Sequence, residues 1–132
     1  MQNAMACIRG DGIRGAVRFS SRPQGVLVTV EVLGLPDGFH GFHIHAGPDC
    51  GGEAFSHTGS HFGAGSHPDH AGDLPPLLSC GGRAFLSVVT GRFCIGDILG
   101  RTVVIHSLPD DFRSQPAGDS GEKIACGKII CC

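Results

Sequence analysis

Val26-Leu27-Val28-Thr29-Val30-Glu31-Val32 has a hydrophobic repeat of two residues. Successive side chains of a strand point to opposite faces, so the valines lie on one side and Thr29 and Glu31 on the other. This stretch predicts a half-buried β-strand. Similar short apolar runs occur at Ala16 to Phe19, Ala84 to Val89, Thr102 to His106 and Ile124 to Ile130.

Helices of ordinary length have little room in this chain. It contains 22 Gly and 8 Pro among 132 residues, and its longest stretch free of both is Met1 to Arg9. Short helices are marginal without extensive packing. Turn signals separate the apolar runs, at Gly10-Asp11-Gly12, Leu35-Pro36-Asp37-Gly38 and Gly81-Gly82. These features predict one all-β domain over residues 1–132, an antiparallel sandwich or barrel.

Composition excludes several classes of protein. A content of 41% hydrophobic and 17% charged residues is typical of a folded chain rather than a disordered one. The formal net charge of −2 gives no reason to expect nucleic acid or an acidic membrane surface as a partner. No charged segment followed by an apolar one opens the chain, and no apolar run reaches transmembrane length, so we expect a cytoplasmic protein without a membrane partner.

The segment from Ala46 to Pro76 lacks β-periodicity, and long loops in small domains are usually functional. Seven of the eight histidines fall between His40 and His70, inside or next to this segment. His43 and His45 lie two residues apart, which on a strand places both rings on one face. Alone, such a pair is more often packing or surface than a metal site, but the gathering of imidazoles favours metal binding.

Two metal sites can be assembled from these residues. Three imidazoles and one carboxylate form a closed set of the kind that zinc prefers, whereas four imidazoles suit copper in a flattened arrangement. Sharing His61 would join the two sites. For Asp73 a turn or cap role, and for His67 a solvated loop position, are the alternatives. The expected ligands are His43, His45, His61 and His106 for copper, and His61, His67, His70 and Asp73 for zinc.

The seven cysteines form no C-x-x-C pair, which argues against a zinc finger or a thioredoxin motif. An odd number leaves at least one thiol without an intramolecular partner. We expect Cys131-Cys132 to be a frayed tail, with lipidation as the alternative. Cys7 and Cys94 are expected to be buried or interface thiols.

Five motifs occur in the order and context seen in copper/zinc superoxide dismutases, from about Ala6 to Ile130. They are Gly41-Phe42-His43-Ile44-His45, Gly59-Ser60-His61-Phe62-Gly63, His70-Ala71-Gly72-Asp73-Leu74, Gly100-Arg101-Thr102-Val103-Val104-Ile105-His106 and Ala125-Cys126-Gly127. Five motifs in register are far more specific than any one of them. The chain therefore resembles this family.

The resemblance implies an eight-stranded Greek-key β-barrel with long metal-binding loops, and an enzyme that converts superoxide to oxygen and hydrogen peroxide. Copper and zinc would be the cofactors, bridged by His61, which would act as both ligand and proton carrier. Asp110 matches an aspartate that hydrogen-bonds histidines of both sites. From sequence alone, a turn role after Pro109 is equally plausible for it. His40 matches a structural histidine that is not a ligand.

The chain departs from the family pattern beside the copper site. Lys123 occupies the position of the arginine that attracts and orients the substrate anion, two residues before the Ala-Cys-Gly motif. Lysine keeps the charge but lacks the planar fork of donors, so we expect steering to survive and docking to be less exact. The loop from Phe112 to Gly121 is also shorter than usual, which suggests wider access.

The zinc loop is compressed as well. His67 is the best match to the second zinc ligand, with His57 in reserve. The family joins this loop to the barrel by a disulfide whose second half corresponds to Cys126, while the usual first position falls at Phe55 or a neighbour. Cys50, the only cysteine in the loop, is the expected partner.

Other classes of protein fit these residues less well than the enzyme. A non-catalytic copper-binding or chaperone-binding module of the same fold is the main alternative, although all four copper positions are filled and Lys123 is cationic. A zinc hydrolase would need a general base, and no unassigned Glu lies near the ligands. A metal-free sandwich would leave the histidines unexplained. The implied partners are superoxide, a copper chaperone and a second copy of the chain.

Overall fold

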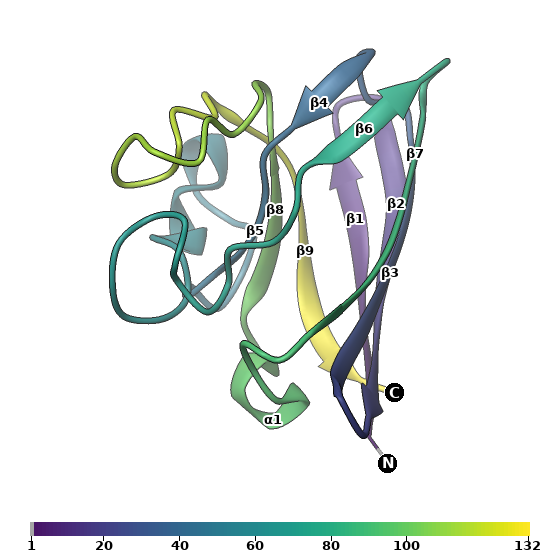
Figure 1. The fold of residues 1–132 in the computed structure, drawn as a ribbon. Helices are drawn as coiled ribbons and strands as arrows, with labels where there is room; N and C mark the ends of the chain where they lie inside the picture. Colours follow the sequence, from purple (N-terminus) through teal and green to yellow (C-terminus); the bar gives the residue numbers. More distant parts are fainter. Residues whose placement is uncertain (1) are drawn as a thin grey trace.

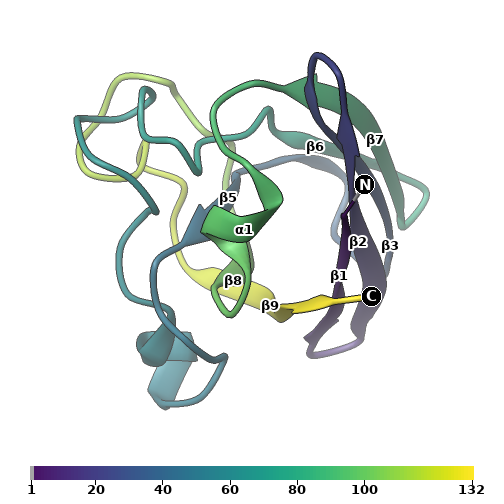
Figure 2. The ribbon, with the colours of Figure 1, turned by 90° about the horizontal axis from the view of Figure 1, so that it is seen from below.

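The computed structural model describes residues 2–132, and its strands form one antiparallel sheet curled into a nearly closed barrel (Figures 1 and 2). Two short helical segments are present in the described chain, the 3₁₀ segment η1 (Glu53–Thr58) and α1 (Ile95–Ile98). The all-β prediction is confirmed. The nine strands are β1 (Asn3–Gly10), β2 (Ile13–Arg22), β3 (Gly25–Leu33), β4 (Gly38–His40), β5 (Phe42–His45), β6 (Leu77–Cys80), β7 (Arg83–Thr90), β8 (Thr102–His106) and β9 (Lys123–Cys131).

The sheet order is β4-β6-β7-β3-β2-β1-β9-β8-β5, so its two edges, β4 and β5, are consecutive pieces of the chain. Gly41 alone separates them. Its N–H donates to Leu108 O and its carbonyl accepts from His106 N, both at 2.9 Å, and a Cβ here would collide with Ser120. Counting β4 and β5 as one interrupted strand gives the expected eight. The interruption at Gly41 changes the pairing partner of this strand from β6 to β8.

The barrel interior is filled by the inward residues of each strand. In β3 the valines predicted to face inward are buried, whereas Glu31 is exposed. Phe93 packs edge-on against Phe19 with ring centroids 6.4 Å apart, and Ile95 and Ile98 of α1 are buried beside it. Figure 2 shows α1 lying across one end of the barrel. Burial of this apolar set is the main source of fold stability.

Parts of the fold depart from the sequence-based expectations. The strands β1, β4 and β6 were not predicted, because β1 and β6 have no clear alternation of apolar and polar residues and β4 is only three residues long and begins in the predicted turn at Gly38. The frayed-tail interpretation of the C-terminus is wrong: Cys131 ends β9 and pairs with Ala4, and Cys132 N donates to Asn3 O at 3.1 Å. Cys7 and Cys94 are exposed, so of their two expected roles burial is excluded and a place at an interface stays a prediction.

Two loops lie together on the outer side of β5 and β8 (Figures 1 and 2). We call residues 46–76 the long loop and residues 107–122 the C-terminal loop. As predicted, the long loop contains no strand, only η1 and the isolated bridge residues His61 and Asp73. Within residues 2–132, no helix has the length and apolar character needed to cross a membrane.

Candidate metal centre

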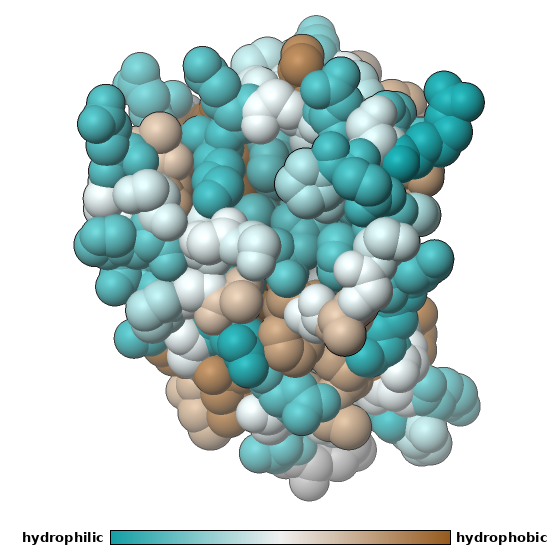
Figure 3. Space-filling model, turned by 90° about the vertical axis from the view of Figure 1, so that its left-hand side faces the viewer, coloured by the Kyte–Doolittle hydropathy of each residue, from teal (hydrophilic) through white to brown (hydrophobic). Residues whose placement is uncertain are grey.

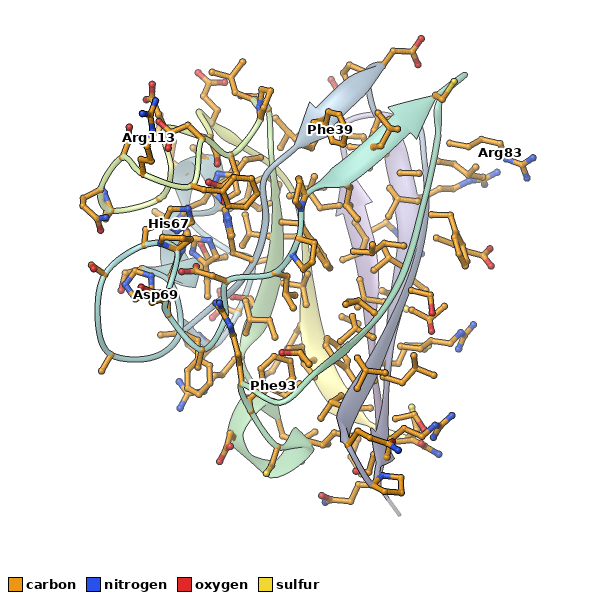
Figure 4. All side chains as sticks on the ribbon, viewed as in Figure 1. Phe39, His67, Asp69, Arg83, Phe93 and Arg113 are labelled. Carbon is orange, nitrogen blue, oxygen red and sulfur yellow. A yellow bond between two sulfur atoms is a disulfide. The ribbon has the colours of Figure 1, made fainter. Side chains whose placement is uncertain are left out.

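Strand pairing and two isolated bridges bring the predicted ligands together. β5 carries His43 and His45 and pairs with β8, which ends at His106. The long loop returns to β5 through bridges of His45 with His61 and of His43 with Asp73. Figure 4 shows His67 among side chains between the loops and the barrel, and Figure 3 shows that the outer surface of this side is largely hydrophilic.

Four buried histidines form the first cluster: one ring nitrogen from each of His43, His45, His61 and His106 lies within 4.8 Å of the others. Carbonyl oxygens fix the tautomers of two of them. His45 Nδ1 donates to Gly59 O at 2.8 Å and His106 Nδ1 donates to Gly121 O at 3.3 Å, since a carbonyl can only accept. Their Nε2 atoms, 3.4 Å apart, therefore face each other as unprotonated nitrogens when the rings are neutral.

Burial keeps the rings of His43, His45 and His106 neutral in the metal-free protein. It lowers the pKa of His45 to about 2 and that of His106 to about 4. Burial, with repulsion from His61, also lowers the pKa of His43 to about 3. Ring nitrogens that stay unprotonated at neutral pH are ready to donate their lone pairs to a metal.

The second cluster adjoins the first through His61 and is organised by Asp73. His61 Nδ1 donates to Asp73 Oδ1 at 2.6 Å, while Asp73 Oδ2 lies 3.0 Å from His70 Nδ1 and 3.2 Å from His67 Nδ1. The backbone N–H of His70 also donates to Asp73 Oδ2 at 2.9 Å. Burial opposes the ionised form, but the hydrogen bond from His61 prevails and lowers the pKa of Asp73 to about 2.

Asp110 joins the two clusters from the C-terminal loop. Its Oδ2 accepts from His43 Nε2 at 2.9 Å and its Oδ1 accepts from His67 Nε2 at 2.7 Å. Despite its burial, these two hydrogen bonds hold the pKa of Asp110 below the ordinary value. Gly118, at a φ of 68°, allows this approach, because a Cβ there would collide with Asp110 and His67. Asp110 thereby fixes which nitrogen of each ring is free.

Buried polar atoms without a hydrogen-bond partner indicate where a metal ion could bind. Among the described residues, the buried side-chain nitrogens that lack a hydrogen bond are His43 Nδ1, His61 Nε2 and His67 Nδ1. Unsatisfied buried polar atoms are rare and need an explanation. Each belongs to a ring whose other nitrogen is held by a carboxylate, an arrangement common to metal-binding histidines. The donor set therefore fits two metal ions.

Lys123 lies at the start of β9, close to the first cluster. Its Nζ donates to Thr58 Oγ1 at 2.7 Å and to Gly59 O at 3.1 Å, the same carbonyl that His45 contacts. Partial burial lowers the pKa of Lys123, and its charge in turn contributes to the lowered pKa values of His45 and His106. Lys123 is thus a cation fixed beside the four-histidine cluster.

The predicted disulfide is present and positions this part of the long loop. Cys50 and Cys126 are bonded, with Cα atoms 5.8 Å apart. Cys126 lies in β9 three residues after Lys123, and Cys50 lies shortly before η1, which ends at Thr58. The bond confirms the expectation from the sequence. It also links the part of the long loop near Thr58 and Gly59, which Lys123 contacts, to β9, the strand that carries Lys123.

Removing the disulfide is expected to destabilise the metal-free protein. It spans 76 residues, for which loop-closure entropy predicts a loss of about 4.5 kcal/mol in unfolding free energy. Urea denaturation of Cys50→Ala/Cys126→Ala measures this loss, with Cys80→Ala, an exposed free thiol, as the control. A double variant within about 1 kcal/mol of the parent would contradict the expectation.

Two other histidines lie outside the clusters. His57, the reserve zinc ligand, is exposed and contacts Asp49 at 2.7 Å. Both ring nitrogens of His40 lie near carbonyl oxygens, of His106 at 2.8 Å and of Pro36 at 2.7 Å, so His40 has no nitrogen available to a metal. His67, by contrast, is buried between Asp73 and Asp110.

Sequence reasoning missed Arg92, which holds the long loop from outside. One terminal guanidinium nitrogen lies 2.7 Å from Pro68 O, 3.1 Å from His70 O and 3.3 Å from Asp73 O. The missed partners Gly59 and Gly121 also act through backbone carbonyls. Every peptide has such a carbonyl, so residue type gave no signal for these roles.

A β-barrel that carries two adjoining histidine-rich clusters defines a binuclear metalloprotein. The family model described as copper/zinc superoxide dismutase matches residues 13–129. A "Superoxide dismutase [Cu-Zn]" of Legionella pneumophila is 36% identical over 125 residues, covering 87% of this chain and 76% of the relative. Those of Caulobacter vibrioides and Onchocerca volvulus are each 34% identical, covering 91% and 96% of this chain and 80% and 94% of the relatives.

The chain belongs to the copper/zinc superoxide dismutase family, and copper and zinc are the cofactors that membership implies.

Proposed function

We propose that the chain is a superoxide dismutase in which His43, His45, His61 and His106 hold copper. The support comes from the ring nitrogens of these histidines, one of which is free in each ring. His45 Nε2 and His106 Nε2 are free because their Nδ1 atoms donate to carbonyls, and His43 Nδ1 and His61 Nε2 have no partner. Four imidazoles within reach of one another suit copper.

We assign zinc to His61, His67, His70 and Asp73. One potential ligand atom from each of His43, His61, His67 and Asp73 lies within 4.8 Å of the others, and His70 is not in this set. His43 nevertheless belongs to copper, because Asp110 occupies its Nε2 and leaves only one nitrogen. His70 Nδ1 lies 3.0 Å from the Asp73 carboxylate and completes a set of three nitrogens and one oxygen, which zinc prefers.

Bound copper would supply the one-electron acceptor and donor through which two superoxide ions and two protons become oxygen and hydrogen peroxide. Lys123 attracts the anion and holds it near the copper ligands. His61 is the proton carrier, since its Nε2 is free of protein partners and its Nδ1 is oriented by Asp73. Asp110 fixes the rings of His43 and His67, which keeps one nitrogen of each directed to its metal.

The observation that carries this proposal is the convergence of free, buried nitrogens beside a fixed cation. Purified protein should contain about one copper and one zinc per chain and consume superoxide. Metal analysis combined with a superoxide assay tests both. Stoichiometric copper with no superoxide consumption would overturn the enzyme assignment and favour a copper-binding module, the second candidate.

Replacing Lys123 with arginine should speed the enzyme. Lys123 Nζ is shared between Thr58 and Gly59, whereas a guanidinium could contact both oxygens and still present a planar fork to the substrate. We expect Lys123→Arg to raise kcat/KM for superoxide about threefold. Pulse radiolysis measures it, with Lys128→Arg, an exposed lysine on the same strand, as the control. No gain would count against the docking argument.

Arg92 is expected to support zinc retention. Its guanidinium lies near the carbonyls of His70 and Asp73, two proposed ligands, and loss of such supporting partners typically lowers metal affinity 10- to 100-fold. Because Arg92 is solvent-exposed, we expect about tenfold weaker zinc binding in Arg92→Gln. Competition with a chelator measures it, with Arg92→Lys for partial rescue and Arg22→Gln as the control. Unchanged zinc affinity would refute the role.

We also propose a copper chaperone and a second copy of the chain as partners. Family membership is the support for both. Light scattering of the metal-loaded protein tests the homodimer, and transfer of copper from a metallated donor protein tests the chaperone. A monomer at all concentrations would exclude the dimer.

A further inference from the structure

A shallow hollow of about 840 Å³ lies on the outer face of β1, β2, β3 and β7. This face is on the opposite side of the barrel from the metal-binding loops (Figure 1). In Figure 4, Arg83 points away from the barrel on this side, whereas His67 lies on the other. The small residues Cys7, Gly15 and Ala16 line the hollow, so it is open and shallow.

Four arginines surround the hollow, and strand register places three of them in one row. Arg9 on β1 pairs with Arg14 on β2, Arg14 pairs with Leu33 on β3, and Leu33 pairs with Arg83 on β7. Arg18 lies two positions further along β2 than Ala16 and is exposed. The four guanidinium groups therefore gather on one sheet face.

Little of this positive charge is neutralised within the molecule. Four of the ten Lys and Arg residues line the hollow, together with a single acid, Glu31. No arginine of residues 2–132 forms an ion pair with a carboxylate, and across that same range Arg14 and Arg83 donate no side-chain hydrogen bond. An uncompensated cluster on a chain of net charge −2 indicates an anionic partner.

Substrate steering does not explain the cluster. Superoxide is consumed on the other side of the barrel, and screening limits the reach of exposed charges to about 8 Å at physiological salt. Charge on this face would draw the anion away from the metal centre. The arginines are also exposed, whereas a site for a small ligand would enclose it.

We propose that this face docks a partner protein through a segment in which one large apolar side chain is flanked by Asp and Glu. Phe85 is 63% exposed and Leu33 is 39% exposed, and both line the hollow between the arginines. Exposed aromatic side chains and arginines are the residues that most often dominate protein interfaces. The apolar side chain packs against Phe85 and Leu33, and the acids pair with Arg14 and Arg83.

Two other occupants fit less well. A second copy of the chain related by a two-fold axis would bring the same arginines against one another, and only one Glu31 from each face would oppose them. A phosphate polymer laid along the face would pass the Glu31 carboxylate, which pairs across the sheet with Phe85, and would gain little from the apolar residues. A protein segment can offer Glu31 a donor.

The test uses the metal-loaded protein and a fluorescein-labelled peptide, Asp-Glu-Asp-Leu-Glu-Asp-Glu, followed by fluorescence anisotropy. We expect saturable binding that Arg14→Gln/Arg83→Gln weakens about tenfold and that added salt weakens further. The charge-matched control, Arg22→Gln/Arg113→Gln, removes two exposed arginines outside the hollow and should change affinity less than about twofold. Neither pair belongs to the metal centre.

Three results would overturn the proposal. Absent binding, or equal weakening by both arginine pairs, would show that the hollow does not recognise the peptide. Equal affinity for a peptide with serine in place of leucine would indicate a general polyanion surface. Binding to phosphatidylglycerol vesicles through Arg14 and Arg83, without peptide binding, would indicate a membrane surface.

Discussion

His61→Ala is expected to lower superoxide consumption at least about 100-fold. Loss of a residue that only supports a metal ligand costs up to about 100-fold, and loss of a ligand should cost at least as much. The substitution removes a ring that belongs to both clusters, since His61 Nδ1 contacts Asp73 and one nitrogen of His61 lies within 4.8 Å of a nitrogen of each of the other three histidines. It also removes the proposed proton carrier. Both copper and zinc affinity should fall together, because one ring serves both sites.

Metal titration and pulse radiolysis measure these effects. His57→Ala is the matched control, because His57 is an exposed histidine of the same loop with a carboxylate partner of its own. It should retain activity and both metals. If His61→Ala lost copper alone and kept its zinc affinity, the shared-ligand account would be wrong.

The metal-free protein should lose stability steeply between pH 6.5 and pH 4. Burial lowers the pKa of His43, His45 and His106 to about 3, 2 and 4, from the ordinary value of 6.5. In this range the unfolded chain binds protons that the folded chain does not, so unfolding becomes easier as pH falls. Each ring contributes up to about 1.4 kcal/mol per pH unit, and the three together up to about 4 kcal/mol per pH unit.

The lowered pKa of Asp73 does not change the slope between pH 6.5 and pH 4. Its contribution is present above the ordinary value of 3.8 and disappears only as pH falls towards its folded value of about 2, below the range in question. Urea denaturation of chelator-treated protein at several pH values measures the slope. His45→Gln should reduce it by about one third, and His57→Gln should leave it unchanged. A flat profile would show that the rings are not held neutral.

Much of this molecule was predictable from residue pattern. The period of two in Val26 to Val32 predicted β3 and its inward valines, and the lack of periodicity predicted the strand-free long loop. Side-chain type predicted the histidines that cluster. It could not predict that Gly41 would divide a strand, because that division depends on contacts with His106, Leu108 and Ser120 far along the chain.

The tautomers of the ligand rings were likewise beyond the sequence. They are set by the carbonyls of Gly59 and Gly121 and by the two oxygens of Asp110, whose positions depend on the closed barrel and the disulfide. From sequence, Asp110 was as plausible in a turn. Only its distances to His43 and His67 show that it joins the two clusters.

The central claim is that His61 is shared by two metals. Anomalous diffraction from crystals of the copper- and zinc-loaded protein, recorded at both absorption edges, tests it most directly. We expect a copper peak among His43, His45, His61 and His106, and a zinc peak among His61, His67, His70 and Asp73, with the ring of His61 in contact with both metals. A single metal, or two metals of which only one contacts His61, would contradict it.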